Sequence, residues 1–243
     1  MATPTPRPPA DVEALLALLQ RDPGRPRITW YGSGGERVEL SGAVLANWVS
    51  KTTNLLVDEV DAAPLVRVRL DLPAHWRTLV WALAVWRCGA CVVVDAQDAD
   101  VVVTDRPAQA PAGSLVVAVA LPALARGFGP DLPGDAVDGA AVLSQPDVVV
   151  WAPALVPDAP ALVADGTTVA HDRLLTTGPA EPDGRRVAIA GDDLSTVVRT
   201  ALTTWASDGS VVLVEPGVAA ELRSDPARRA RVLGPENVTD DRV

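Results

Sequence analysis

Residues 65–95 read LVRVRLDLPAHWRTLVWALAVWRCGACVVVD, and this stretch decides the fold class. The apolar run Leu65–Leu70 predicts a buried strand, and Pro73 then opens a helix. Gly89 ends this helix, and Cys91–Asp95 has the valine-rich, unalternating composition of another buried strand. Valine-rich strands between amphipathic helices predict a parallel or mixed sheet that helices cover on both faces.

The same alternation of strands and helices continues on both sides of this stretch. We predict a three-layer αβα fold with a mostly parallel sheet, in a single domain over residues 11–234. Residues 1–10 are expected to form a loose N-terminal tail, and residues 235–243 a polar C-terminal tail. The other predicted elements are a helix from Asp11, strands Arg27–Tyr31 and Glu36–Leu40 with a turn at Gly32–Gly35, a helix from Ser41 to Val57, strands Asp100–Thr104, Leu115–Ala120 and Asp147–Trp151, a helix near Ala170–Thr177, strand Val187–Ala190, helix Leu194–Ala206, strand Val211–Val214 and a helix from Val218 to Val232.

Composition limits the compartment and the classes of partner. Apolar residues make up 48% of the 243 residues, enough for a sizeable core, and the net charge is -10. Phosphate binding needs clustered Lys and Arg, so we expect no nucleic-acid partner and no docking on anionic membranes. The sequence has no signal-peptide pattern and no disulfide framework, so the cytoplasm is the expected compartment. Lys51 is the single lysine, and any mechanism that needs a lysine must use it.

Four segments share their pattern with one known superfamily. They are Ile28–Leu56 with its strand, turn, strand and helix, Leu72–Ala90 with LPAHW and ALAVWRCGA, Asp98–Asp105 with DADVVVTD, and Asp208–Leu213 with DGSVVL, which a helix and Asn237-Val238-Thr239 follow. This pattern resembles the N-terminal part of the adenylate-forming superfamily, which includes acyl-CoA synthetases, peptide-synthetase adenylation domains and luciferases. The resemblance implies the fold of the first subdomain of those enzymes, here as a truncated, AMP-dependent synthetase-like domain. It also implies ATP-dependent acid ligation as the ancestral activity, with AMP or an acyl-adenylate as ligand.

The phosphate-binding loop of that superfamily has no counterpart in this sequence. In the family it is a Ser/Thr/Gly-rich loop that ends in Pro-Lys-Gly, and it should follow the predicted strand Asp147–Trp151. The residues found there contain no glycine before Gly166 and no hydroxyl before Thr167. Val169–Leu175 reads VAHDRLL and resembles the family's HTHRNLL, which places Asp165 where the lysine should be. Two unit charges about 4 Å apart interact by roughly 4 kcal/mol at an effective dielectric of about 20, and this change turns attraction into repulsion.

We therefore expect that the domain does not adenylate a substrate by the family mechanism. The adenine- and ribose-binding motifs and the small C-terminal domain with its catalytic lysine are also expected to be missing, since the sequence ends before them. The favoured function is a non-catalytic binding or regulatory relative of acyl-CoA synthetases, which binds an acyl group, a nucleotide fragment or a protein. One alternative is an enzyme of altered chemistry in the residual cleft, and another is a protein-interaction or dimerisation module.

Candidate site residues gather in the stretch that replaces the loop. His171 could act as a base with an acid neighbour such as Asp172, although a helix-start histidine that is paired locally is the commoner case. His75, near a helix start, is expected to cap the helix or to lie at the surface. No spaced set of metal ligands is present. The candidates for ligand binding are Asp165, Gly166, Thr167 and Thr168.

Two further features have simple structural explanations. Cys88 and Cys91 form a C-x-x-C pair at the C-terminal end of a helix, where the helix dipole does not favour a thiolate, so we interpret them as small buried residues. The tryptophans are expected to be core and packing residues. An exposed tryptophan on a flat apolar patch would favour an interaction module, and a concave polar pocket at residues 165–171 would favour an enzyme.

Overall fold

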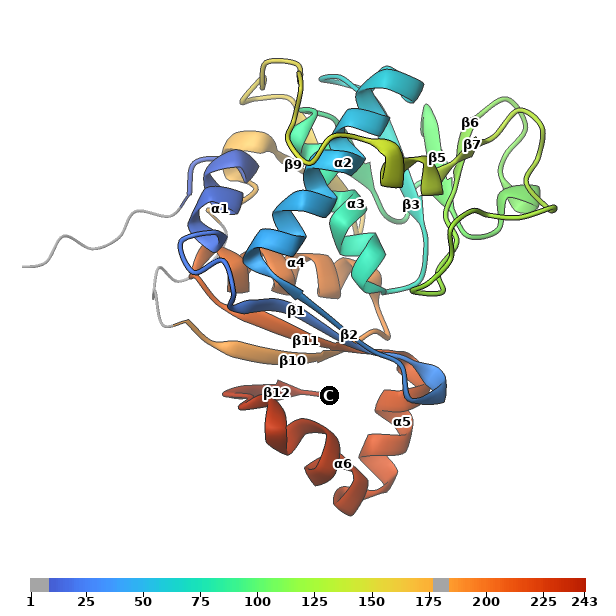
Figure 1. Ribbon diagram of the computed structural model, residues 1–243. Helices are drawn as coiled ribbons and strands as arrows, with labels where there is room; N and C mark the ends of the chain where they lie inside the picture. Colours follow the sequence, from blue (N-terminus) through green and yellow to red (C-terminus); the bar gives the residue numbers. More distant parts are fainter. Residues whose placement is uncertain (1–8, 177–183) are drawn as a thin grey trace, which may run out of the picture. The chain divides into compact units, whose positions relative to one another are not determined.

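The computed structural model describes residues 9–176 and 184–243, and it is an α/β structure with two sheets in these residues (Figure 1). The chain divides into two compact units, one made of the residues up to Ala43 together with Asp172–Val243, the other of Val44–His171. No helix in the described part of the chain is long and apolar enough to cross a lipid bilayer.

The first unit contains a five-stranded sheet in the order β12-β10-β11-β1-β2. Neighbouring strands are parallel, except that β1 and β2 form an antiparallel hairpin. In Figure 1, α5 and α6 lie on one face of this sheet, and α4 lies on the other with α1 beside it. The elements are α1 (Val12–Leu19), β1 (Pro26–Tyr31), β2 (Arg37–Ser41), β10 (Arg186–Ala190), α4 (Leu194–Ala206), β11 (Ser210–Val214), α5 (Pro216–Ser224), α6 (Pro226–Leu233), β12 (Asp240–Arg242) and the short 3-10 helices η1 (Ser33–Gly35), η4 (His171–Arg173, which begins at the unit boundary) and η5 (Gly234–Glu236).

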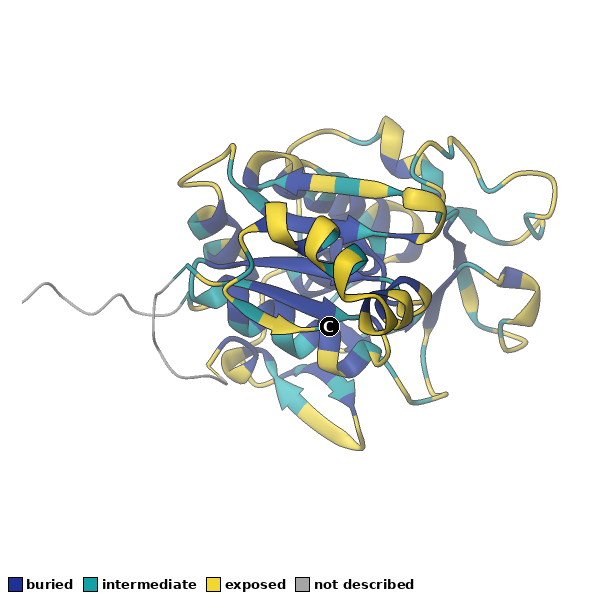
Figure 2. Ribbon diagram, turned by 90° about the horizontal axis from the view of Figure 1, so that it is seen from below, coloured by how far each residue is buried: buried dark blue, intermediate teal, exposed yellow. Residues whose placement is uncertain are grey.

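Aspartate side chains cap three helices of the first unit, α1, α4 and α6, and apolar side chains hold the helices to the sheet. Asp11 caps α1 by accepting from the backbone N–H of Ala14 at 2.8 Å, and Asp193 caps α4 in the same way. All five residues of β11 are buried, as expected for a central strand covered on both faces (Figure 2). The core between the sheet, α5 and α6 includes Ala188, Val212, Val214, Val218, Ala219, Leu222 and Leu233.

The second unit contains a seven-stranded sheet in the order β7-β6-β5-β3-β4-β8-β9, parallel except for the β8–β9 hairpin. Helix α3 is buried along its whole length apart from Arg77 and Arg87. The elements are α2 (Gly42–Val60, which begins in the first unit), β3 (Arg67–Asp71), α3 (Trp76–Arg87), β4 (Cys91–Val93), β5 (Val101–Thr104), β6 (Leu115–Ala118), β7 (Val137–Asp138), β8 (Pro160–Ala164), β9 (Thr167–Ala170) and the 3-10 helices η2 (Pro107–Gln109) and η3 (Gly139–Ser144).

The predicted α/β class and mostly parallel strand pairing are confirmed, with two sheets in place of the one expected. Every valine-rich strand suits any buried parallel position, so their composition does not reveal which strands pair. The predicted single domain over 11–234 stays a prediction, and within it lie the two compact units. The C-terminal tail predicted over 235–243 is polar, but β12 in it joins the first sheet.

Several local predictions are wrong. Asp147–Trp151 is not a strand, and Pro160–Ala164, in a stretch expected to be a loop, is one. The segment from Pro146 to Val150 hydrogen-bonds to a side chain of α2 instead of a neighbouring strand. In place of the helix predicted near Ala170–Thr177, the structure has the end of β9 and a short 3-10 helix, and residue 177 lies outside the described residues.

Candidate functional site

The stretch expected to hold a phosphate loop is a tight hairpin turn between β8 and β9. Ala164 pairs with Thr167, and only Asp165 and Gly166 lie between them. Both turn residues have positive φ, 53° and 68°, the conformation that Asp-Gly adopts in two-residue hairpins. The Thr167 hydroxyl donates to the Ala164 carbonyl at 2.8 Å, and Thr167 and Thr168 are exposed.

The strand that leads into this turn corrects the sequence analysis. We expected the loop to follow Asp147–Trp151, but the strand before the turn is β8. The expected loop region therefore contains β8, a two-residue turn and β9. A ligand site formed by Asp165, Gly166, Thr167 and Thr168 stays a prediction, and these four residues offer one short turn and two exposed hydroxyls.

His171 and Asp172 have different surroundings. The His171 ring is buried, and its Nε2 lies 3.0 Å from the carbonyl oxygen of Gly89. Burial lowers the pKa of His171, which favours the neutral ring. Asp172 is exposed and lies 3.6 Å from the guanidinium of Arg173. The catalytic role stays a prediction, and the geometry is that of a buried histidine with a backbone partner.

The predicted roles of His75 and the two cysteines are confirmed. His75 is the N-cap of α3, where its Nδ1 accepts from the backbone N–H of Arg77 at 3.1 Å. Burial, aided by the charge of Arg77, lowers the pKa of His75 to about 3. Cys88 and Cys91 are buried and free, and burial raises the pKa of their thiols to about 12 and about 11. Within the described ranges, no group of three or more His, Cys, Asp or Glu side chains could hold a metal ion.

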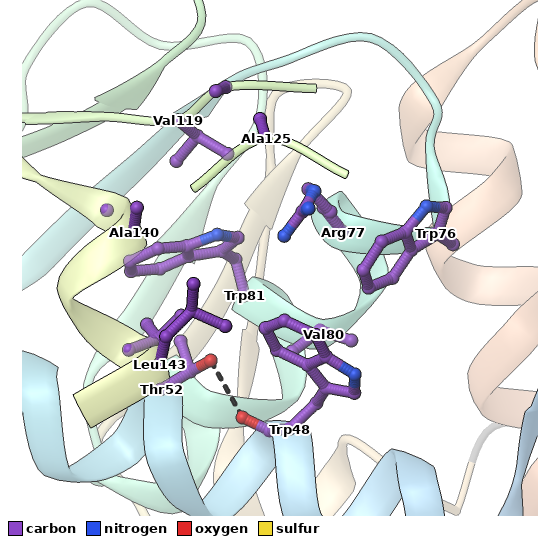
Figure 3. A pocket seen from close by; sticks show the side chains of 13 residues that line it. Trp48, Thr52, Trp76, Arg77, Val80, Trp81, Val119, Ala125, Ala140 and Leu143 are labelled. Atoms are coloured by element: carbon purple, nitrogen blue, oxygen red, sulfur yellow. Dashed lines mark hydrogen bonds between the residues drawn. The ribbon is translucent and has the colours of Figure 1, made fainter. Parts of the chain in front are cut away.

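Three tryptophans and an arginine line a narrow hollow in the second unit (Figure 3). The guanidinium of Arg77 lies 4.4 Å from the ring centroid of Trp76 and 5.4 Å from that of Trp48, within the range of cation–π contacts. The Trp48 and Trp76 rings meet edge to face, and Trp81 lines the opposite wall. The cavity measures about 20 Å³, which is room for no more than about one water molecule. This cluster is a packing feature, as the sequence analysis expected of most tryptophans.

Trp151 is the exception among the tryptophans. Its exposed fraction is 62%, and Val148 and Val150 beside it are 67% and 72% exposed. By contrast, the buried indole of Trp86 donates to the Ala161 carbonyl at 2.7 Å. Large apolar side chains gathered on an exposed segment are typical of interaction surfaces.

Helix α2 holds this exposed segment in place. The buried Asn54 side chain donates to the carbonyls of Pro146 and Val148 at 3.2 and 2.9 Å, and accepts from the N–H of Val150 at 3.0 Å. Lys51 forms an ion pair of 2.8 Å with Asp147. The single lysine of the chain therefore has a structural partner. Asn54 could not be predicted as a structural residue, because no sequence pattern distinguishes it from a solvent-facing asparagine.

Comparison with known proteins identifies the fold. No family model matches the sequence. A Mycobacterium tuberculosis protein, whose name gives a family number and no activity, is 48% identical over 101 residues, which are 40% of this chain and 42% of that protein. The solved structure of Brucella canis acyl-CoA synthetase has a TM-score of 0.73 at 18% identity, over 95% of this chain and 46% of that one.

A second solved structure contains an N-terminal subdomain alone, and almost the whole of this chain matches it. The N-terminal subdomain of Klebsiella oxytoca NpsA, in complex with 3-hydroxybenzoyl-AMSN, has a TM-score of 0.68 at 15% identity, over 99% of this chain and 61% of that one. The chain therefore has the fold of the N-terminal subdomain of adenylate-forming enzymes, as its sequence predicted. It spans less than half the length of the acyl-CoA synthetase and of the curated relative it matches.

Proposed function

We propose that this chain is an AMP-dependent synthetase-like pseudoenzyme, a domain that acts by binding and does not adenylate a carboxylic acid. The observation that carries the proposal is the two-residue turn at Asp165 and Gly166. A phosphate loop works by presenting several backbone N–H groups and a lysine to the phosphates. Two turn residues cannot surround a triphosphate, and Lys51 is engaged with Asp147.

Pyrophosphate exchange tests this proposal directly. We expect the purified chain to transfer no label from pyrophosphate into ATP with any acid in a panel of fatty and aromatic acids. The Brucella canis acyl-CoA synthetase, assayed in parallel, is the positive control. Acid-dependent exchange by this chain above the rate without acid would refute the proposal.

AMP or an acyl-adenylate is the ligand class we propose for a binding role, because the fold is that of a subdomain whose Klebsiella oxytoca example was solved with 3-hydroxybenzoyl-AMSN. A ligand at 100 times its Kd adds about 2.7 kcal/mol to the free energy of unfolding, which a thermal-shift assay detects. A shift with AMP or an acyl-adenylate analogue but not with adenosine would support the assignment. The absence of any shift would remove this ligand class.

The exposed segment around Trp151 favours a second candidate, a protein-interaction or dimerisation module. Replacing Trp151 with alanine should leave the free energy of unfolding within about 0.5 kcal/mol, because the side chain is mostly exposed. If the segment is an interface, the same change lowers self-association or partner capture, which sedimentation and cross-linking measure. An unchanged association state would count against this candidate.

The surroundings of His171 do not favour the third candidate, an enzyme of altered chemistry at residues 165–171, because the His171 Nε2 atom already contacts the Gly89 carbonyl. A cytoplasmic location without nucleic-acid or membrane partners belongs to the same proposal. The net charge of -10 and the buried, free thiols of Cys88 and Cys91 support it.

A further inference from the structure

One face of the first sheet changes from apolar to polar along its strands. Alternate residues of a strand share a face, so Arg186 lies on the same face as Ala188, and Ser210 on the same face as Val212. Ala188 and Val212 belong to the core under α5 and α6, whereas Arg186 and Ser210 lie at the beginning of their strands, beyond that core. Polar side chains at the end of a covered face leave room for a solvent-filled hollow.

An open groove of about 400 Å³ lies over this polar end. Small-molecule sites in proteins are clefts of roughly 300–1,000 Å³ with a few convergent polar groups. The groove has such groups on strands distant in sequence and on the C-terminal segment. They include Arg25, Arg37, Arg186, Ser210, Glu39 and Glu236.

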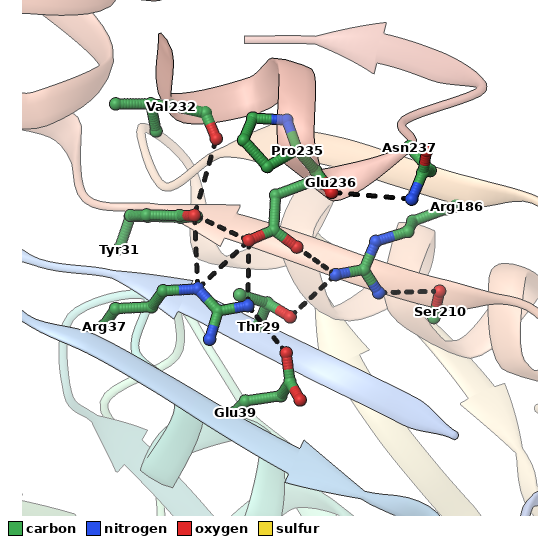
Figure 4. Close-up of polar contacts among 10 residues, drawn as sticks. All are labelled: Thr29, Tyr31, Arg37, Glu39, Arg186, Ser210, Val232, Pro235, Glu236 and Asn237. Atoms are coloured by element: carbon green, nitrogen blue, oxygen red, sulfur yellow. Dashed lines mark hydrogen bonds and ion pairs between the residues drawn. The ribbon is translucent and has the colours of Figure 1, made fainter. Parts of the chain in front are cut away.

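A buried carboxylate fixes two of the three guanidinium groups (Figure 4). Glu236 is 5% exposed and accepts from Tyr31 Oη at 2.6 Å and from Arg37 Nη2 at 2.9 Å. It also pairs with Arg186, which lies on its other side in Figure 4. Burial alone would raise the pKa of Glu236, but hydrogen bonds from Tyr31, Arg186 and Arg37 lower it, so the carboxylate is charged at neutral pH. Its negative charge is compensated by the guanidinium groups of Arg37 and Arg186.

The lining residues of the groove include three guanidinium groups and two carboxylates, those of Glu39 and Glu236. Arg25, Arg37 and Arg186 have side-chain exposures of 30%, 43% and 14%. Glu39, at the rim of the groove, pairs with Arg37 at 2.6 Å. Arg25 donates to the Gly184 carbonyl at 2.8 Å and pairs at 3.6 Å with Asp208, which is not among the lining residues. Three guanidinium groups directed to one hollow contrast with a chain whose net charge is -10.

We propose that this groove binds a small organic anion through a phosphoryl or carboxylate group held by Arg25, Arg37 and Arg186. Guanidinium groups bind both kinds of oxyanion through paired, charge-assisted hydrogen bonds. Because Glu236 holds Arg37 and Arg186 before the ligand arrives, little side-chain freedom is lost on binding. The Ser210 hydroxyl accepts from Arg186 at 3.2 Å and keeps its own hydrogen for the ligand.

This site is independent of the proposed function. All its residues belong to the first unit, and the hairpin that replaces the phosphate loop belongs to the second. A failure of the groove to bind an anion therefore leaves the absence of adenylation untouched, and the reverse also holds.

Titration calorimetry at low ionic strength tests the groove, with pyrophosphate as the phosphoryl probe and citrate as the carboxylate probe. We expect binding of one molecule per chain by at least one probe, with an affinity that falls as salt is added. The tighter probe identifies the oxyanion type. Arg25→Gln should weaken binding about tenfold or more, because it removes one charge-assisted interaction. Glu39→Gln should strengthen binding, since it removes the opposing charge at the rim.

Arg223→Gln is the matched control, because Arg223 is an exposed arginine of the same unit that pairs with Asp192 outside the groove. It removes the same charge from the chain and should leave the affinity unchanged. Circular dichroism confirms that each variant is folded, and Glu39→Gln alone suffices if Arg25→Gln does not fold. Equal losses in Arg25→Gln and Arg223→Gln, weaker binding in Glu39→Gln, or no binding of either probe would overturn the proposal.

Discussion

Replacing Asn54 with alanine tests whether the exposed segment around Trp151 is a fixed surface. The Asn54 side chain makes three hydrogen bonds to the backbone of Pro146, Val148 and Val150, at 2.9 to 3.2 Å. Each such bond contributes about 1 kcal/mol, which gives about 3 kcal/mol as an upper value. The freed backbone groups are near the surface and can bind water, so we expect a loss of about 1–2 kcal/mol in the free energy of unfolding.

Asn47→Ala is the control for this measurement. Asn47 is exposed on the same helix, so both changes raise helix propensity equally, and the difference between the two variants isolates the three hydrogen bonds. Urea unfolding measures the difference, and limited proteolysis shows whether cleavage after Trp151 becomes faster in Asn54→Ala. A difference below about 0.5 kcal/mol with unchanged proteolysis would refute the reasoning, since the segment would then not depend on Asn54.

Three further predictions concern buried charged and reactive groups. Glu236→Gln should lower the free energy of unfolding above about pH 4.5 and should make the protein lose less of that free energy in acid. The pKa of Glu236 is lower in the folded state than in the unfolded state, so the stabilisation by its carboxylate is present above the unfolded-state pKa and is lost as the pH falls through the folded-state pKa. Urea unfolding from pH 7 to 3 measures this change. Arg27→Met should cost about 2–4 kcal/mol in chemical unfolding, because the fully buried guanidinium donates to the Leu19 and Asp208 carbonyls and pairs with the half-exposed Asp208 carboxylate. Cys88 and Cys91 should react with a thiol reagent only as fast as the protein opens, because burial raises their pKa to about 12 and about 11; rapid reaction of the native protein at pH 8 would contradict this.

Most helices and strands could be predicted from local sequence patterns, because caps, apolar periodicity and turn residues act over a few neighbouring residues. The helix from Asp11 has its apolar stripe and its aspartate cap in the structure, and the hairpin at Gly32–Gly35 has glycines at positive φ. Asp147–Trp151 failed because its valine run meets the same criteria as a true strand, and a strand also needs a partner. Here the competing partner is one buried amide, Asn54, on a helix about ninety residues earlier.

In the candidate site too, features formed by neighbouring residues could be predicted from the sequence, and features formed by distant residues could not. The composition of the stretch before Val169 predicts that no phosphate loop forms there, and this stays a prediction, although the strand that leads to the turn was assigned wrongly. The groove was not readable, because Arg25, Arg37, Arg186 and Glu236 come from separate elements that only the sheet order brings together. Glu236 lies in a polar C-terminal stretch, where a glutamate ordinarily faces solvent, and no sequence signal marks it as buried.

The turn at Asp165 and Gly166 also explains how β8 and β9 pair without a longer connection. Asp-Gly is among the best sequences for a two-residue hairpin, because both residues tolerate positive φ. Next to the turn the hairpin keeps β8 and β9 in register, with Val163 opposite Thr168 and Ala164 opposite Thr167, and the register shifts only farther along, between Pro160 and Leu162. A chain that had lost single loop residues would keep a long, glycine-rich segment with its entropic cost. The structure has instead a short Asp-Gly turn, and this supports the proposal that the domain does not adenylate a substrate.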